Sequence, residues 1–390
     1  MAANRRLRAL GAVLVAGWVL AGCSYLNPFD WWKSDPNTKI PDLTPITATV
    51  TLSQAWRVNA GSAGDLAVFY PALASGHIYT AARDGTVTRL DAATGRVEWR
   101  VKETTELSGG VGADDKLVVV GNLQGEVLAL SAADGSLRWR GFVSSEVLAP
   151  PVVAGDLVLV RSSDSRIFAL DTLDGRRKWV YQRSATSLAV RNPAGLVVSR
   201  GNAFAGFPGG KLVSIALSNG GVRWESTVSL PRGTSELERV TDVVGLPWLS
   251  DREVCAVAFQ GRVACFDLGT GAASWTRDMS SVAGLTGDAR YLYIPDEKGA
   301  VNALDRSAGT SVWKQDRLLR RGLSVPLARG GQVIMGDVKG YVHVLSRDSG
   351  ALIGRFATDG SAIAAAPMEL DNGRVLIQTR GGELYALDIH

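Results

Sequence analysis

The chain has 390 residues, of which 46% are hydrophobic, 21% charged and 7% aromatic. This composition is typical of a globular protein and excludes wholesale disorder or a collagen-like structure. Of the formal charge of +4, three units come from arginines of the first eight residues, a segment that we expect to be removed; the remaining +1 gives no electrostatic reason to expect a nucleic-acid partner. Three cysteines are too few for a disulfide scaffold, and three histidines, in separate parts of the chain, leave little material for a metal site.

Residues 1–22 have the pattern of a secretory signal peptide. A basic start is followed by an apolar run from Ala9 to Leu20, which is shorter than the ~20 residues needed to span a bilayer. The run leads into Leu-Ala-Gly-Cys, ending at Cys23, which resembles the lipobox of bacterial lipoproteins. That resemblance implies cleavage before Cys23 and its acylation, with Ser24 favouring the outer membrane and a position facing the periplasm. The alternative is a simple signal peptide followed by a chance cysteine.

Residues 23–46 are expected to form the lipidated N-terminus and a flexible tether. Four of the 14 prolines of the chain lie in this short segment. Proline-rich segments are semi-extended and form poor cores, so we expect the folded domain to begin near residue 47.

A repeat with a mean length of about 42 residues fills residues 47–390. Each unit has a glycine, a large apolar residue five positions later, a second glycine ten positions later and a tryptophan fourteen positions later. The first glycines are Gly85, Gly125, Gly210, Gly261, Gly299, Gly340 and Gly382, with Ser165 in the remaining unit. The tryptophans are Trp99, Trp139, Trp179, Trp224, Trp275 and Trp313, and only Gly354 breaks this column.

Short β-rich runs separated by glycine turns predict four strands per unit, and the chain shows no convincing helical period. The fold class is therefore all-β, an eight-bladed β-propeller. The last unit ends after its third strand, whereas an unassigned tryptophan-bearing strand, Ser53 to Val58, lies upstream. We expect this N-terminal strand to complete the last blade and close the ring, with the tryptophans packing between blades.

The motif Leu-Asp-x-x-x-Gly-x-x-x-Trp, as in Leu90 to Trp99, resembles the tryptophan-docking repeat of PQQ-type quinoprotein propellers. Together with the lipobox, the tether and the eight units, it resembles the BamB family of the outer-membrane β-barrel assembly machinery along essentially the whole chain. The resemblance implies a non-catalytic scaffold that binds a BamA-type barrel protein through its POTRA domains. It also implies contact with unfolded outer-membrane proteins and attachment to the outer membrane by the lipid anchor.

The residues favour this scaffold over a quinone enzyme. No two cysteines are adjacent, as they typically are beside the quinone of alcohol dehydrogenases, and no loop of alternating oxygen ligands suits calcium. We therefore predict no catalytic residue, cofactor or metal. A propeller that binds another envelope component is the alternative, and a PQQ-dependent dehydrogenase is the less favoured one.

Two unusual connections between blades are candidates for partner binding. The segment 180–193 contains Leu188, Val190 and Arg191, and the segment 230–246, the largest insertion, contains Asp242. Resemblance to the BamB family assigns these four residues to the POTRA-binding surface, although Val244 replaces the second aspartate of the family motif. Two roles are open for Arg191: an ion pair with Asp242 would orient the two loops, or the guanidinium would contact a carboxylate of the partner. The alternative is that Leu188 and Val190 begin an inner strand and belong to the core.

Cys255 and Cys265 flank the turn Phe259-Gln260-Gly261. A three-residue turn would place them directly opposite each other, within disulfide distance, whereas a two-residue turn would strain the bridge. Two buried thiols are the alternative, so the sequence leaves the disulfide open.

Overall fold

The computed structural model describes residues 40–64, 67–184, 188–191 and 193–390. These residues form strands and turns without a helix, and accordingly none of them belongs to a helix long and apolar enough to cross a membrane. The predicted signal peptide, Cys23 and most of the predicted tether lie outside the described residues.

Thirty-two strands form eight antiparallel sheets of four strands each. Blades one to four are β2 (Ala72–Ala74), β3 (His77–Ala81), β4 (Thr86–Asp91), β5 (Val97–Lys102); β6 (Gly109–Ala113), β7 (Leu117–Gly121), β8 (Glu126–Ser131), β9 (Leu137–Phe142); β10 (Val152–Ala154), β11 (Leu157–Ser162), β12 (Arg166–Asp171), β13 (Arg177–Gln182); β14 (Leu196–Ser199), β15 (Asn202–Phe207), β16 (Lys211–Ala216), β17 (Val222–Thr227).

Blades five to eight are β18 (Val243–Leu249), β19 (Glu253–Ala258), β20 (Arg262–Asp267), β21 (Ala273–Asp278); β22 (Thr286–Gly287), β23 (Tyr291–Pro295), β24 (Val301–Asp305), β25 (Ser311–Gln315); β26 (Leu327–Arg329), β27 (Gln332–Gly336), β28 (Tyr341–Ser346), β29 (Leu352–Ala357); β30 (Met368–Glu369), β31 (Val375–Gln378), β32 (Glu383–Ile389) and β1 (Leu52–Asn59).

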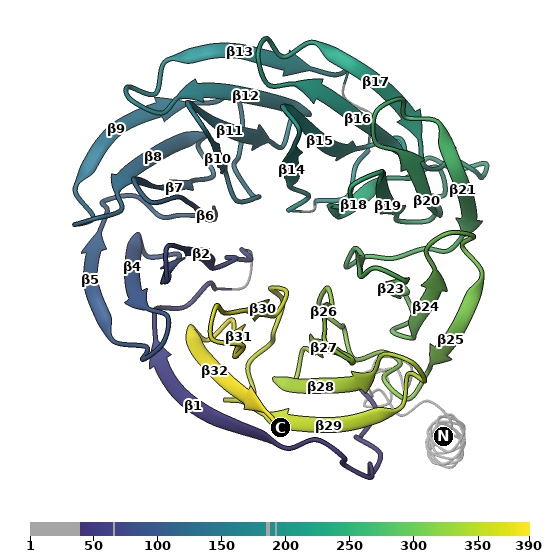
Figure 1. The fold of residues 1–390 in the computed structure, drawn as a ribbon. Coiled ribbons are helices and arrows are strands. Elements are labelled where there is room, and N and C mark those ends of the chain that lie inside the picture. Colours follow the sequence, from purple (N-terminus) through teal and green to yellow (C-terminus); the bar gives the residue numbers. More distant parts are fainter. Residues whose placement is uncertain (1–39, 65–66, 185–187, 192) are drawn as a thin grey trace, which may run out of the picture. The chain divides into compact units, whose positions relative to one another are not determined.

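The ring closes as the sequence predicts, and the eight-bladed propeller is confirmed. The N-terminal strand β1 pairs antiparallel with the C-terminal strand β32 along its whole length, from Leu52 opposite Ile389 to Asn59 opposite Glu383. Figure 1 shows β1 and β32 side by side on the rim, so strands from the two ends of the propeller complete one blade. Closure leaves no gap between the first and last units of the repeat.

The tryptophans lock neighbouring blades together. Trp139 donates its ring Nε1–H to the carbonyl oxygen of Thr172 in the next blade (2.9 Å) and covers Gly175 of that blade. A Cβ added at Gly175 would lie 2.5 Å from the ring, and this glycine also has a positive φ of 70°. Glycine is therefore required twice over, by the turn and by the approach of the ring. The other tryptophans of the column repeat this contact, as predicted.

Gly354, the exception in the tryptophan column, has a structural reason. Blade eight takes its fourth strand from β1, so it has no glycine turn on which a tryptophan of blade seven could dock. The side chains of Val50 and Leu52 fill that place, and a Cβ at Gly354 would lie 2.6 Å from Val50 Cγ2. The backbone amides of Thr49 and Val50 donate to the carbonyl oxygen of Ile353.

The segment ahead of β1 lies against blade seven. The compact unit that contains the propeller begins at Leu43, earlier than residue 47, the boundary expected from the sequence. Arg317 donates to Thr44 Oγ1 (2.8 Å) and to the carbonyl oxygen of Pro45 (2.5 Å), and Ile46 packs on the core of blades six and seven. We call residues 43–51 the N-terminal strap.

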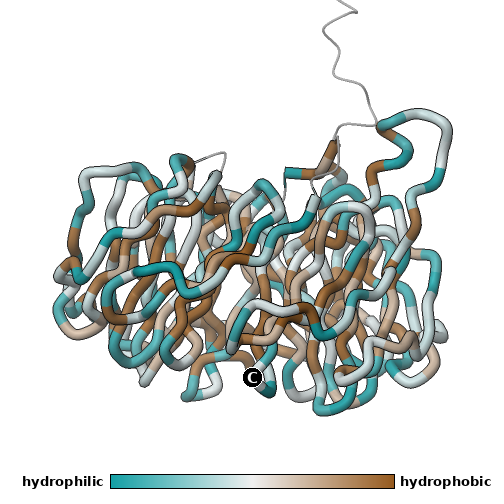
Figure 2. Tube along the Cα trace, turned by 90° about the horizontal axis from the view of Figure 1, so that it is seen from above, coloured by the Kyte–Doolittle hydropathy of each residue, from teal (hydrophilic) through white to brown (hydrophobic). Residues whose placement is uncertain are grey.

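Segments that join the outer strand of one blade to the inner strand of the next emerge on one face, because each blade has four antiparallel strands. These segments are 60–71, 103–108, 143–151, 183–195, 228–242, 279–285, 316–326 and 358–367. We call this side the connection face. Figure 2 shows the ring from its side, with hydrophobic residues concentrated between loops that are mainly hydrophilic.

Candidate partner-binding site

Two neighbouring connections form the candidate site, one between blades three and four and the other between blades four and five. Leu188 is 44% exposed and Val190 is 37% exposed, and the inner strand β14 begins only at Leu196. These two side chains therefore do not begin a core strand, which was the alternative interpretation of the sequence. They form a small exposed apolar patch on the connection face, which we call the apolar step.

Asp242 holds the two connections together. One carboxylate oxygen accepts the backbone N–H of Val190 (2.5 Å), and the other accepts that of Gly209 in the turn between β15 and β16 (3.2 Å). Its carbonyl oxygen also accepts the N–H of Phe259 (2.8 Å). The residue is only 4% exposed, and this burial raises the pKa of its carboxyl group. Asp242 therefore orders the loop that carries Val190 and offers little surface to a partner.

Arg191 does not pair with Asp242, which was one of the two roles that the sequence left open for it. Its guanidinium instead lies 3.4 Å from the carboxylate of Glu146, in the connection between blades two and three. Both side chains are substantially exposed, at 46% and 35%, so the pair is accessible. The reason for the difference is that both carboxylate oxygens of Asp242 face backbone amides. Sequence analysis missed Glu146 because it belongs to a third connection.

Val244 explains the departure from the family motif. It is 2% exposed and packs in the core of blades five and six with Leu285 and Leu292. A carboxylate at this position would be desolvated without a partner, which costs several kcal/mol. Of the two acidic positions that the resemblance led us to expect, this chain has an aspartate only at the buried Asp242.

The insertion of residues 228–242 adds further apolar surface. Leu230 and Leu237 are 65% and 72% exposed. The turn between them is ordered by Glu238, whose carboxylate accepts the backbone N–H groups of Thr234 (2.8 Å) and Ser235 (3.1 Å), which lowers the pKa of Glu238 to about 2. A hollow of about 310 Å³ separates this insertion from Leu188.

Some of the exposed large apolar side chains lie in the connections, whereas others, such as Phe142 and Leu173, lie elsewhere on the propeller. Those in these segments are Leu188, Val190, Leu230, Leu237, Val282 and Leu319. Large apolar side chains around polar and arginine groups are typical of protein–protein contact surfaces. The connection face therefore has the chemistry of a docking surface.

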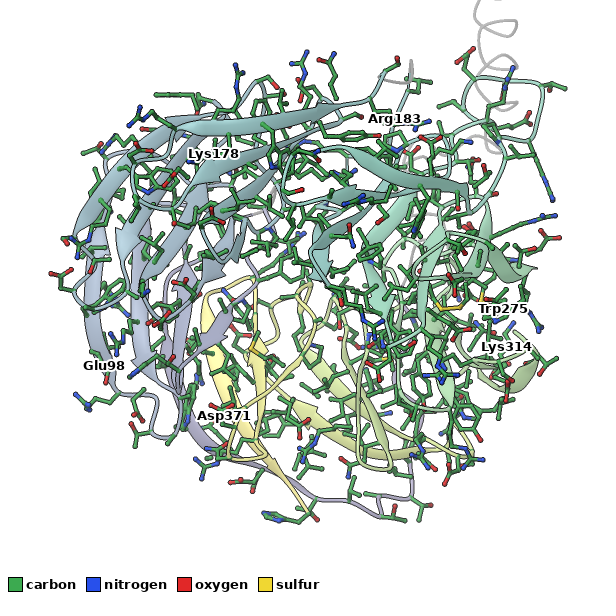
Figure 3. All side chains as sticks on the ribbon, turned by 45° about the horizontal axis from the view of Figure 1, so that its top comes forward. Glu98, Lys178, Arg183, Trp275, Lys314 and Asp371 are labelled. Atoms are coloured by element: carbon green, nitrogen blue, oxygen red, sulfur yellow. A yellow bond between two sulfur atoms is a disulfide. The ribbon has the colours of Figure 1, made fainter. Side chains whose placement is uncertain are left out.

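A disulfide joins Cys255 and Cys265 beneath the candidate site. The turn between β19 and β20 has three residues, which places the two cysteines directly opposite each other with their Cα atoms 4.1 Å apart. Both cysteines are fully buried. Figure 3 shows the disulfide in yellow near Trp275, which is the partner of Cys265 on the neighbouring strand. The same turn carries Phe259, whose amide binds Asp242.

The central channel holds a cavity of about 640 Å³ with a predominantly apolar wall. Prolines, valines and leucines in and next to the inner strands dominate the lining, and Glu369 is the one charged residue among the described residues that line it. PQQ carries three carboxylates, which such a lining would repel or leave desolvated. The residues present do not fit this cofactor. Among the described residues, no group of three or more histidine, cysteine, aspartate or glutamate side chains is placed to hold a metal ion.

Comparisons with known proteins show the family to which the chain belongs and agree with its fold. The family model described as "Outer membrane protein assembly factor BamB" matches residues 83–315 and 298–390. The protein of this name from Bordetella pertussis is 40% identical over 376 residues, which cover 96% of this chain and 95% of the relative.

Solved structures give the same result. The crystal structure of BamB from Moraxella catarrhalis superposes with a TM-score of 0.79 at 27% identity, covering 87% of this chain and all of that one. A quinohemoprotein alcohol dehydrogenase from Comamonas testosteroni has a TM-score of 0.67 at 13% identity, covering 86% of this chain and 76% of that chain. The second likeness concerns the fold alone.

Proposed function

Because the chain belongs to the BamB family of outer membrane protein assembly factors, we propose that it is a non-catalytic scaffold for the folding and insertion of outer-membrane β-barrel proteins. It docks through its connection face on the POTRA domains of a BamA-type barrel subunit. The observation that supports this docking mode is the apolar step of Leu188 and Val190 beside Arg191, on a loop that Asp242 holds from below.

Contacts that hold Val190 and Arg191 in place favour docking. Association costs conformational entropy when side chains and loops become fixed at an interface. The hydrogen bond from Val190 to Asp242 and the pairing of Arg191 with Glu146 hold the loop before a partner arrives. Exposed leucine and valine then supply buried apolar area, and the guanidinium of Arg191 supplies a directional contact to a partner carboxylate.

Membrane attachment belongs to the same proposal. Acylated Cys23 would hold the protein at the outer membrane, facing the periplasm, through the N-terminal segment of residues 23–46. The N-terminal strap passes Arg317, in the connection between β25 and β26, before it reaches blade eight. The chain therefore enters the propeller from the face that carries the proposed docking loops.

Unfolded outer-membrane proteins would contact outer rather than inner blade edges. Inner strands such as β10 and β26 are only three residues long, and Pro151 and Pro326 directly precede them. Proline has no N–H to donate to an added strand. Outer strands such as β13 have six residues and no further strand beside them in their sheets. A client strand could therefore add to an outer edge.

The test is retrieval of the barrel subunit from detergent-solubilised outer membranes by wild type, Arg191→Glu and Arg223→Glu at equal abundance. Arg223 is exposed at the start of β17, on the opposite face, and controls for the change of charge. We expect wild type and Arg223→Glu to retrieve a barrel protein with POTRA domains and Arg191→Glu to lose it. Retrieval by all three would place the site elsewhere, whereas retrieval by none would favour a scaffold for another envelope component.

A further inference from the structure

Arg161 lies in the seam between blades three and four, next to the candidate site. It belongs to β11, and its guanidinium lies over the ring of Phe207 in β15, 4.8 Å from the ring centre. Nη1 points to the carbonyl oxygen of Gly195 at 3.5 Å, which is the limit of a hydrogen bond. Gly195 belongs to the connection that also carries Leu188 and Arg191, so the guanidinium lies next to that loop.

This arginine has no carboxylate of its own. Among the described residues, no acidic side chain lies within ion-pair distance of Arg161, in contrast to Arg166 and Arg183 of the same blade. Asp242 acts on it only at longer range, because the oxygens of that carboxylate are taken by the amides of Val190 and Gly209. A guanidinium has five N–H donors, so most of the hydrogen-bonding capacity of Arg161 is unused.

The environment of Arg161 is only partly desolvated. Burial lowers the pKa of its guanidinium to about 10, against 12.5 ordinarily. A partly buried cation without a carboxylate contributes little to the stability of a fold, and a residue that breaks a packing rule without local compensation is often one that serves function. Arg161 nevertheless remains partly exposed, so a ligand can reach it.

We propose that Arg161 is a recognition residue for a carboxylate of the POTRA-bearing partner that docks on Leu188, Val190 and Arg191. This proposal rests on the proposed function and specifies the chemistry of its partner. The partner would present an acidic side chain next to an apolar one. The apolar side chain would cover Leu188 and Val190, and the carboxylate would reach Arg161 between blades three and four. Phe207 fixes the plane of the guanidinium, which favours a two-pronged contact that a lysine could not make.

The experiment measures binding of the purified barrel subunit to the full-length lipoprotein in detergent, together with the melting temperature of each variant. We compare wild type, Arg161→Gln, Arg161→Lys, Arg191→Glu and a control, Arg290→Gln. Arg290 also stacks on an aromatic ring, 5.2 Å from the centre of Tyr291, but lies in the turn before β23, away from the connection face.

We expect Arg161→Gln to weaken binding at least tenfold and to reduce its salt dependence, with an unchanged or raised melting temperature. Arg161→Lys should recover only part of the affinity, and Arg290→Gln should bind like wild type. A purely structural arginine gives another pattern, a lowered melting temperature on replacement. A lowered melting temperature of Arg161→Gln would overturn the proposal. Wild-type affinity of Arg161→Gln, measured when Arg191→Glu fails to bind, would overturn it as well. If wild type itself does not bind the barrel subunit, the proposed function fails and this inference with it.

Discussion

The buried carboxylate of Asp242 accepts a hydrogen bond at 2.5 Å from the backbone amide of Val190, a residue of another inter-blade connection 52 positions earlier in the chain. This contact assigns the acidic residue of the candidate site to the support of a loop. The exposed residues of that loop, Val190 and Arg191, are then left to face a partner. If Asp242 positions the loop, its replacement changes the free protein. If Asp242 only contacts the partner, its replacement changes binding alone.

Asp242→Asn tests the positioning role. An asparagine keeps one acceptor oxygen, but its amide group faces the N–H of Val190 or of Gly209 without accepting a bond. We expect a loss of about 1–3 kcal/mol in the free energy of unfolding, the cost of leaving a buried donor without an acceptor. Hydrogen exchange at the amide of Val190 should become faster in the free protein, and affinity for the barrel subunit should fall.

Asp251→Asn serves as the matched control. Asp251 is exposed in the turn between β18 and β19, on the opposite side of the same blade. The Asp251→Asn variant should have the same stability, the same hydrogen exchange at Val190 and the same affinity for the barrel subunit as wild type. If Asp242→Asn abolishes binding while the exchange of Val190 stays at its wild-type rate, Asp242 contacts the partner directly.

A charge swap separates the two possible roles of Arg191. Arg191→Glu places two carboxylates together at Glu146, and the double variant Arg191→Glu with Glu146→Arg restores an opposite pair. Because both side chains are exposed, stability should change by only about 0.5 kcal/mol in either variant. We expect the double variant to remain unable to bind the barrel subunit, measured by co-purification, because the partner meets inverted charges. Restored binding would instead assign Arg191 an intramolecular role.

The fold was predictable because its information is periodic. Glycine and tryptophan recur at fixed offsets, and each pair of them forms one inter-blade contact, as Trp139 and Gly175 do. The missing fourth strand and the unassigned strand around Trp56 then leave one way to close the ring. Local spacing and a simple count were sufficient for this inference.

The candidate site was predictable only in part. Resemblance pointed to Leu188, Val190, Arg191 and Asp242, and the topology placed their connections on one face. Their contacts depend on distances between blades, which no spacing encodes: Glu146 comes from a third connection, and Asp242 turns inward to backbone amides. The stacking of Arg161 on Phe207 joins two strands of different blades, and no sequence signal singles it out.

The disulfide can be tested chemically on a soluble Cys23→Ser variant. We expect no free thiol after unfolding without reductant, because Cys255 and Cys265 are bridged. Unfolding with a reductant should lower the free energy of unfolding by about 2–3 kcal/mol, the value expected for a loop of this short length. The comparison uses one protein under two conditions, so no cavity is introduced. Two titrated thiols would show that the bridge is absent.

Buried His343 should make stability depend on pH. His343 and Asp337 are fully buried, and Nε2 of the histidine lies 2.9 Å from the carboxylate oxygen of Asp337 that also pairs with Arg321 (2.6 Å). Burial lowers the pKa of His343 and outweighs the hydrogen bond and charge of Asp337, which raise it; the nearby charges of Arg355 and Arg321 act in the same direction as burial. The unfolded chain therefore takes up a proton at a higher pH than the folded protein.

The sign follows from linkage. Stability is complete above the ordinary histidine pKa of about 6.5 and decreases as the pH falls below it, by at most ~1.4 kcal/mol per pH unit. His343→Asn should flatten this decrease between pH 7 and 5 in urea unfolding, because Asn302 holds Asp296 in the same way in blade six. His390→Asn at the exposed C-terminal residue should keep the wild-type slope. An unchanged slope in His343→Asn would assign the pH dependence to other groups.

The packing of the N-terminal strap against Gly354 leaves no room for a side chain at this position, so a larger residue there should lower stability. A Cβ there would meet Val50 Cγ2 at 2.6 Å and Leu52 Cδ1 at 2.8 Å, so Gly354→Leu must displace the strap or shift β29. We expect a loss of about 1–3 kcal/mol in the free energy of unfolding, as for other overpacked sites, together with faster proteolysis within residues 43–51. Gly331→Leu is the control, because a Cβ at that turn meets nothing within 4 Å. Equal stability of the two variants would mean that the strap contributes nothing to the closure of the ring.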